Sequence, residues 1–76
     1  MKQKVPVTMR AIVQRINRKL APNMEKLLAA RSERVRLDLG DYYVVDQRRN
    51  FLIHKDVDPE TYAREIGVLA EWEKLT

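Results

Sequence analysis

Apolar residues recur with a helical period near the start of the chain. Five of them are separated by three, one, three and four positions: Met9, Ile12, Val13, Ile16 and Leu20. Because an α-helix makes one turn in about 3.6 residues, this spacing gathers the five side chains onto one stripe. Thr8 suits the N-cap, where its hydroxyl group accepts a hydrogen bond from a free N–H group of the first turn. Since Pro22 disfavours helical geometry at the residue before it, we predict a helix over residues 8–21.

The next segment, residues 23–39, carries two competing patterns. Four residues fit a second helix capped by Asn23: Met24, Leu27, Leu28 and Arg31. However, the stretch RVRLDL from Arg34 to Leu39 alternates between polar and apolar residues, as a half-buried strand does. We expect a first strand somewhere within residues 26–39, and the sequence leaves helix and strand open for residues 24–32.

Residues 41–55 have the pattern of a β-hairpin. Two runs rich in aromatic and β-branched residues, YYVV and FLIHK, flank the polar stretch DQRRN. Such runs favour strands, and the polar residues between them favour a turn. Gly40 precedes the first run, and Asn50 suits the left-handed conformation that a short loop often needs.

Helix-start and helix-stop signals follow the hairpin. Asp58 suits the N-cap, and Pro59 suits the first helical position, where its missing N–H group costs nothing. Gly67 follows Ile66 where a left-handed residue commonly ends a helix, and Val68 is placed to pack back as in a Schellman motif. We therefore predict a short helix that begins at Pro59 and ends near Ile66.

The elements together predict one small α+β domain that spans residues 1–76, with residues 1–6 flexible. Its order is helix, strand, hairpin, helix, or α-β-β-β-α, with two helices packed on one face of a three-stranded antiparallel sheet. The tail LAEWEKLT has Leu69, Trp72 and Leu75 at helical spacing, and we expect it to dock on the body of the domain.

The net charge of +4 is unevenly distributed. Residues 1–37 contain ten Lys and Arg residues and two Glu residues, whereas the remainder contains five basic and nine acidic residues. An asymmetry of this kind indicates a polyanionic partner, although it also serves to hold two halves of a fold together.

The basic residues of the first helix are the candidate functional site. Five polar side chains would follow its outward face over about 15 Å: Arg10, Gln14, Arg15, Arg18 and Lys19. Arginine forks match phosphate oxygens, and Gln14 or Asn17 could add a contact to a base edge. Three further arginines would extend the surface if the first strand lies alongside: Arg31, Arg34 and Arg36. The leading hypothesis is a non-enzymatic module that contacts nucleic-acid phosphates with weak sequence preference.

Two other interpretations of the same charges stay open. A basic face is also an ordinary solvated helix surface. The arginines could instead pair with acidic residues of the second half, at about 0–1 kcal/mol for each exposed pair: Asp38, Asp41, Glu60 or Glu65.

The aromatic residues support an alternative function. Alternation along a strand sends Tyr42 and Tyr43 to opposite faces of the sheet, so only one of them can serve the core. The other, with Phe51, could stack unpaired bases or contact a partner, although packing in the core or against a partner is favoured. Trp72 is an anchor for the domain or for a groove on a second subunit. The alternative is a protein-interaction module, such as a small inhibitor or accessory subunit, that uses Tyr42 and Trp72 and forms a homodimer or binds another protein.

The composition argues against catalysis, metal binding and cofactors. The chain has no Cys, one His, one Ser and two Gly residues, so thiolate nucleophiles, sulfur-ligated metals and glycine-rich phosphate loops are excluded. His54, with Asp46 across the hairpin, could act as an oriented base, but a packed or exposed strand histidine is the favoured interpretation. We therefore predict no catalytic residues, no metal site and no cofactor. No run of about 18 apolar residues or secretory signal occurs, which predicts a soluble cytoplasmic protein.

Two resemblances accompany this reading. The α-β-β-β-α order resembles the double-stranded-RNA-binding domain in topology, but the segment DVDPET has three carboxylates where that family has a lysine cluster, so its function is not transferred. The segments INRKLA, LGDYYVVD and AREIGVLAEWE, with Asn50 and the pair Val57–Asp58, resemble a family of short uncharacterised bacterial proteins. That resemblance spans most of the chain and implies a stand-alone intracellular protein without implying an activity.

Overall fold

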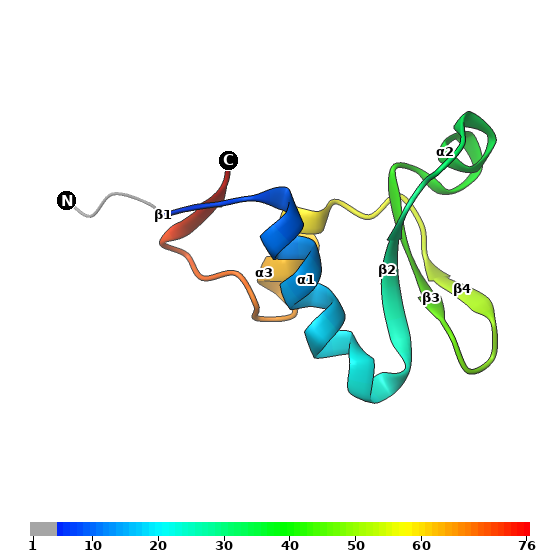
Figure 1. Ribbon diagram of the computed structural model, residues 1–76, viewed down its shortest axis with the longest axis horizontal. Coiled ribbons are helices and arrows are strands. Elements are labelled where there is room, and N and C mark those ends of the chain that lie inside the picture. Colours follow the sequence, from blue (N-terminus) through cyan, green and yellow to red (C-terminus); the bar gives the residue numbers. More distant parts are fainter. Residues whose placement is uncertain (1–4) are drawn as a thin grey trace.

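The computed structural model describes residues 5–76, which form an α+β fold with two sheets (Figure 1). The elements in chain order are β1 (Val5–Val7), α1 (Met9–Leu20), the 3₁₀ helix η1 (Ala21–Asn23), β2 (Glu25–Ala29), α2 (Glu33–Leu39), β3 (Tyr42–Asp46), β4 (Phe51–His54), α3 (Pro59–Glu65) and β5 (Glu73–Leu75). Strands β2, β3 and β4 form an antiparallel sheet in that order, and β1 pairs with β5 in parallel. The predicted order α-β-β-β-α is therefore wrong, because it lacks β1, α2 and β5.

Helix α1 confirms the prediction for residues 8–21 to within one residue at each end. The Thr8 hydroxyl accepts a hydrogen bond from the Ala11 N–H group at 3.1 Å, as the N-cap prediction required. Pro22 lies in η1, which ends when Met24 adopts a left-handed conformation with φ of 60°.

The first strand expected within residues 26–39 is β2, which begins one residue earlier, at Glu25. The two patterns are assigned the wrong way round: β2 lies in the segment that fits a helix capped by Asn23, and α2 occupies the stretch RVRLDL, whose alternation predicts a strand. The Ser32 hydroxyl accepts from the Val35 N–H group at 3.2 Å and so caps α2. Helix α2 has no buried residue. The alternation of polar and apolar residues in its sequence therefore does not mark a face that packs against the core.

The hairpin prediction is confirmed by β3 and β4. Asp46 stabilises the turn, because its Oδ1 atom accepts hydrogen bonds from the N–H groups of Arg48 and Arg49 at 2.9 and 3.0 Å. Asn50 has a φ of 56°, which is the left-handed conformation expected of it. On the other side of β3, β2 pairs so that Leu27 lies opposite Val44.

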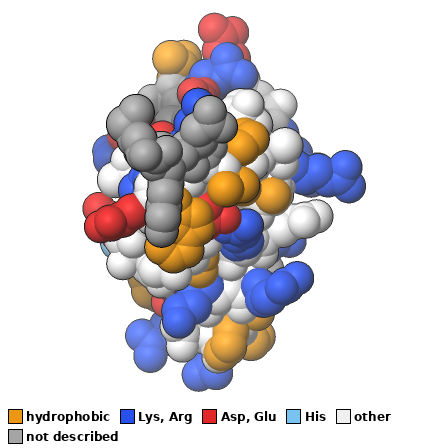
Figure 2. Space-filling view, turned by 90° about the vertical axis from the view of Figure 1, so that its left-hand side faces the viewer, with side chains coloured by type: hydrophobic (Ala, Val, Ile, Leu, Met, Phe, Trp, Pro, Cys, Tyr) orange, Lys and Arg blue, Asp and Glu red, His pale blue; other side chains and the backbone are white. Residues whose placement is uncertain are grey.

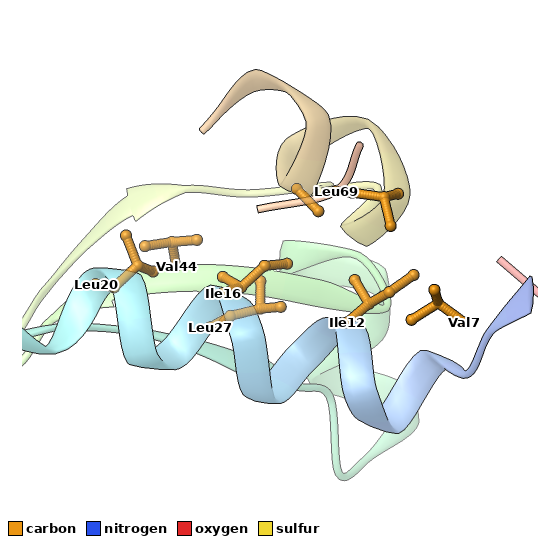
Figure 3. Close-up of a cluster of buried hydrophobic side chains, with 8 residues drawn as sticks. Val7, Ile12, Ile16, Leu20, Leu27, Val44 and Leu69 are labelled. Carbon is orange, nitrogen blue, oxygen red and sulfur yellow. The ribbon is translucent and has the colours of Figure 1, made fainter. Parts of the chain in front are cut away.

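The core lies between α1, the three-stranded sheet and the segment that follows α3 (Figure 3). Its buried residues are Val7, Ile12, Ile16, Leu20, Leu27, Val44, Ala63 and Leu69. Helix α1 packs against β2 and against α3, and thus joins the sheet to the opposite part of the molecule (Figure 1).

The end of α3 and the tail follow the predictions in part. The N–H groups of Val68 and Gly67 donate to the carbonyl groups of Ala63 and Arg64 at 2.9 and 3.2 Å, which is the Schellman pattern. The tail docks as predicted, but as strand β5 beside β1 rather than as a helix. Trp72 is not an anchor in the core, since 61% of its surface is exposed.

The prediction that residues 1–6 are flexible falls partly on residues 1–4, which lie outside the described residues. Val5 and Pro6 belong to β1, whose pairing with β5 continues in a hydrogen bond from the Thr76 N–H group to the Val7 carbonyl at 3.0 Å. None of the helices in residues 5–76 combines the length and the apolar character that crossing a membrane requires.

Candidate nucleic-acid interface

Four of the five predicted polar residues of α1 point to solvent: Arg10, Gln14, Arg18 and Lys19. Within residues 5–76 the ion pairs are Arg15–Glu73, Arg36–Asp41 and Arg64–Glu60, so the three exposed cations of α1 have no carboxylate partner there. Figure 2 views the molecule from the end that carries β1, and Lys and Arg side chains spread over the lower and right-hand parts of that surface. Arg18 and Lys19 also lie in the last turn of α1, where the helix dipole favours positive charge.

Arg15 has a structural role instead. Its Nη1 atom donates to Glu73 Oε1 at 2.9 Å and to the Val68 carbonyl at 3.2 Å, so it ties α1 to the docked tail. The hydrogen bond to Glu73 raises the pKa of Arg15, with burial acting in the opposite direction. The pKa of Glu73 is lowered by the hydrogen bond from Arg15 and then by the bond from the Ala70 N–H group. Arg15 is therefore a fixed guanidinium that is already bonded within the fold.

The side chain of Asn17 is hydrogen-bonded within the fold, so it is not available to contact a base edge. Its Oδ1 atom accepts from the Leu27 N–H group at 2.8 Å, and its Nδ2 atom donates to the Leu27 carbonyl at 3.4 Å. These bonds satisfy the outward backbone groups of the edge strand β2 as a neighbouring strand would. Gln14 remains as the only amide of α1 that is exposed.

A hollow beside α1 brings three of the predicted cations together. It has a volume of about 350 Å³, and it is lined by Arg15, Arg18, Lys19 and Val68. Among residues 5–76 no carboxylate lines it, although Glu73 bonds to Arg15 from the side of the tail. A concave site with this lining attracts an anion such as a phosphate group.

The structure adds three cations that the sequence did not assign to the interface. The Gln47 N–H group donates to the Met24 carbonyl at 2.8 Å, so the β3–β4 turn lies at the same end of the molecule as the last turn of α1 (Figure 1). We call the exposed cations at this end the basic end: Arg18, Lys19, Lys26, Arg48 and Arg49. The nearby carboxylates are Glu25 and Asp46, and Asp46 already accepts two bonds from the turn. The register of β2 against the hairpin creates this cluster, and local sequence patterns do not contain that information.

The three arginines of the α2 region do not extend the interface as predicted, because the condition that they lie on the first strand is not met. Arg34 and Arg36 are on α2 and Arg31 precedes it, at the far end of β2 and β3 from the basic end (Figure 1). Arg36 Nε lies 3.1 Å from Asp41 Oδ1. It also lines a hollow that contains three Asp residues, namely Asp41, Asp56 and Asp58. The environment of Arg36 is therefore acidic.

The remaining candidate residues differ in how far they are buried. Tyr42 packs against the core cluster, so it is not a free contact for a partner, whereas Trp72 is exposed. His54 is exposed and lies opposite Val44 rather than Asp46; its ring and that of Tyr62 are in a T-shaped arrangement with a centroid distance of 5.9 Å. In the described part of the chain, no three or more His, Cys, Asp or Glu residues are grouped so as to hold a metal ion.

Comparisons of the chain with protein-family models, curated proteins and solved structures found no match. The resemblance to short bacterial proteins therefore stays a prediction.

Proposed function

We propose that this protein is a non-enzymatic binding module that contacts nucleic-acid phosphates through the exposed cations of α1. The observation that carries the proposal is that Arg10, Arg18 and Lys19 are exposed and, among residues 5–76, unpaired with any carboxylate. Side chains in this state are free to exchange bound water and counterions for phosphate oxygens. The release of counterions from the nucleic acid then supplies the favourable free energy.

The arrangement favours contact with the backbone over reading of bases. Arginine and lysine bind phosphates without regard to sequence, and Asn17 is occupied by β2. Contacts with the basic end would extend the path of the nucleic-acid backbone from α1 onto the β3–β4 turn. We therefore expect weak sequence preference.

The test is a titration of fluorescently labelled duplex and single-stranded oligonucleotides at low salt. Changing Arg10, Arg18 and Lys19 together to Glu should abolish binding, because three attractive contacts become repulsive. The matched control changes Arg31, Arg34 and Arg36 to Glu, which alters the net charge equally on the α2 region. Binding no tighter than millimolar by the wild-type protein, or equal losses in the two triple variants, would rule out the proposal.

A second candidate function is contact with another protein through Trp72. It is supported by the 61% exposure of Trp72 and the 52% exposure of Val5, whose N–H group donates to the Trp72 carbonyl at 2.6 Å. Large exposed aromatic side chains are frequent anchors at interfaces. A partner retained by the wild-type protein after nuclease treatment and lost by Trp72→Ala would favour this function. Retention of the partner by the Trp72→Ala variant would rule it out.

A further inference from the structure

The three-stranded sheet has a second face, opposite to the one that packs against the core. Leu27 and Val44 point to the core and are 2% and 0% exposed, so their neighbours along the strands point the other way. The register places Leu28 opposite Tyr43, and it places Lys26 and Leu52 on either side of Val45. These residues form the outer sheet face: Lys26, Leu28, Tyr43, Val45 and Leu52.

Contacts within the described chain agree with this division. Tyr42 and Ile53 pack against the core cluster, whereas Leu28, Tyr43, Val45 and Leu52 do not. Leu52 is 38% exposed, and Leu28, Tyr43 and Val45 keep intermediate exposure. Helix α1 covers the core side of β2, and α2 contacts β3 near the end of the sheet that lies away from the β3–β4 turn (Figure 1). The outer sheet face therefore has an aromatic ring on its central strand, with apolar side chains around it.

The charges around the outer sheet face indicate which kind of molecule it binds. Lys26 lies on the face itself, and Arg48 and Arg49 are exposed in the turn at its border. In a second copy packed face to face, each Lys26 would be covered by a face that offers it no carboxylate, which costs free energy. A polyanion with apolar, planar groups fits both the charge and the surface.

We propose that the outer sheet face binds single-stranded nucleic acid, with one base stacked on Tyr43 and the adjoining phosphate near Lys26. Lys26 and Tyr43 are diagonal neighbours on adjacent strands, and such neighbours are about 7–8 Å apart, within reach of long side chains. From Lys26 the nucleic-acid backbone would continue to the other cations of the basic end. Bases in a duplex are stacked on one another and cannot lie on Tyr43, so the face selects single strands. This inference rests on the proposed function and adds the class of nucleic acid.

The experiment compares labelled dT12, rU12 and a 12-base-pair duplex by fluorescence anisotropy. The wild-type protein should bind the single strands more tightly than the duplex. Tyr43→Leu keeps an apolar cover on the sheet but removes the ring, so its affinity for single strands should fall about tenfold. Its affinity for the duplex should change less than twofold. Tyr43→Phe keeps the ring and should stay within twofold of the wild-type protein on all three probes.

A second measurement uses the unmodified sequence and does not depend on how a variant folds. In protein labelled with ¹³C at methyl groups, dT12 should shift the resonances of Leu28, Val45 and Leu52, and the duplex should leave them in place. If single strands bind but Tyr43→Leu binds them as the wild-type protein does, or if these methyl groups do not respond, the inference is overturned while the proposed function stands.

Two further outcomes would also overturn the inference. Methyl shifts that follow protein concentration without any oligonucleotide would assign the face to a homodimer and overturn the inference. If neither single strands nor the duplex binds, the proposed function falls and the inference falls with it.

Discussion

Replacing Asn17 with Ala should destabilise the fold, although Asn17 lies on the helix that carries the proposed interface. The side chain makes two hydrogen bonds to the backbone of Leu27, whose own side chain is buried. A hydrogen bond contributes about 0.5–1.5 kcal/mol net, so two contribute about 1–3 kcal/mol. Alanine regains about 0.5 kcal/mol through its better helix propensity.

The expected loss is therefore about 1.5 kcal/mol in the free energy of unfolding, measured by urea denaturation followed by circular dichroism. For a domain of this size that corresponds to a decrease in Tm of about 6–12 °C. Gln14→Ala is the matched control, because Gln14 is an exposed amide one turn earlier on the same helix. Its unfolding free energy should stay within about 0.5 kcal/mol of the wild-type value.

The competing idea is that Asn17 reads a base edge. In that case Asn17→Ala would weaken binding to nucleic acid and leave stability unchanged. Equal stability of the Asn17→Ala and Gln14→Ala variants would refute the assignment of Asn17 to the edge of β2.

Two further predictions concern backbone conformation and pH. Gly40→Ala should destabilise the protein more than Gly67→Ala in urea denaturation: both glycines have positive φ (84° and 81°), but a Cβ atom on Gly40 would lie 2.8 Å from Asp56 Cα, whereas Gly67 has open space. Equal losses would contradict this. Because the folded protein lowers the pKa of Glu73, the stabilisation is complete above its unfolded value near 4.5 and is lost as pH falls through the lower, folded value. As the pH is lowered through this range, the free energy of unfolding should therefore decrease more steeply for the wild-type protein than for Glu73→Gln. Parallel curves of unfolding free energy against pH would show that Glu73 makes no such contribution.

The elements predicted correctly are those with local signals. Thr8 caps α1, and Pro59 and Gly67 begin and end the helical segment of α3. The polar turn and Asn50 define the hairpin. In each case the deciding interaction lies within a few residues of the chain, so the sequence pattern contains it.

The failures involve interactions between distant segments. Strand β2 is a strand because it pairs with β3 and because Asn17 satisfies its outer edge, and neither partner is visible in residues 25–29. Strands β1 and β5 pair across nearly the whole chain. Helix α2 is the exception, because its cap at Ser32 accepts from Val35 only three residues away and is a local signal. The helix buries no residue, so the alternation in its sequence does not mark a buried strand face.

The candidate site shows the same division. The sequence identified the exposed cations of α1, but it could not assign Arg15 to Glu73, which is 58 residues away. Nor could it place Lys26, Arg48 and Arg49 beside the end of α1, because that neighbourhood is created by the sheet register.

The central claim is that uncompensated cations of α1 bind phosphates, and the salt dependence of binding tests it most directly. For a single strand, log K should fall with log salt with a slope of about −0.7 for each phosphate contacted, so the three exposed cations of α1 contribute about −2 to the slope. Changing Arg18 and Lys19 to Ala should make the slope less steep by about 1.4. A wild-type affinity that does not respond to salt, or a slope that stays the same in this variant, would contradict the account.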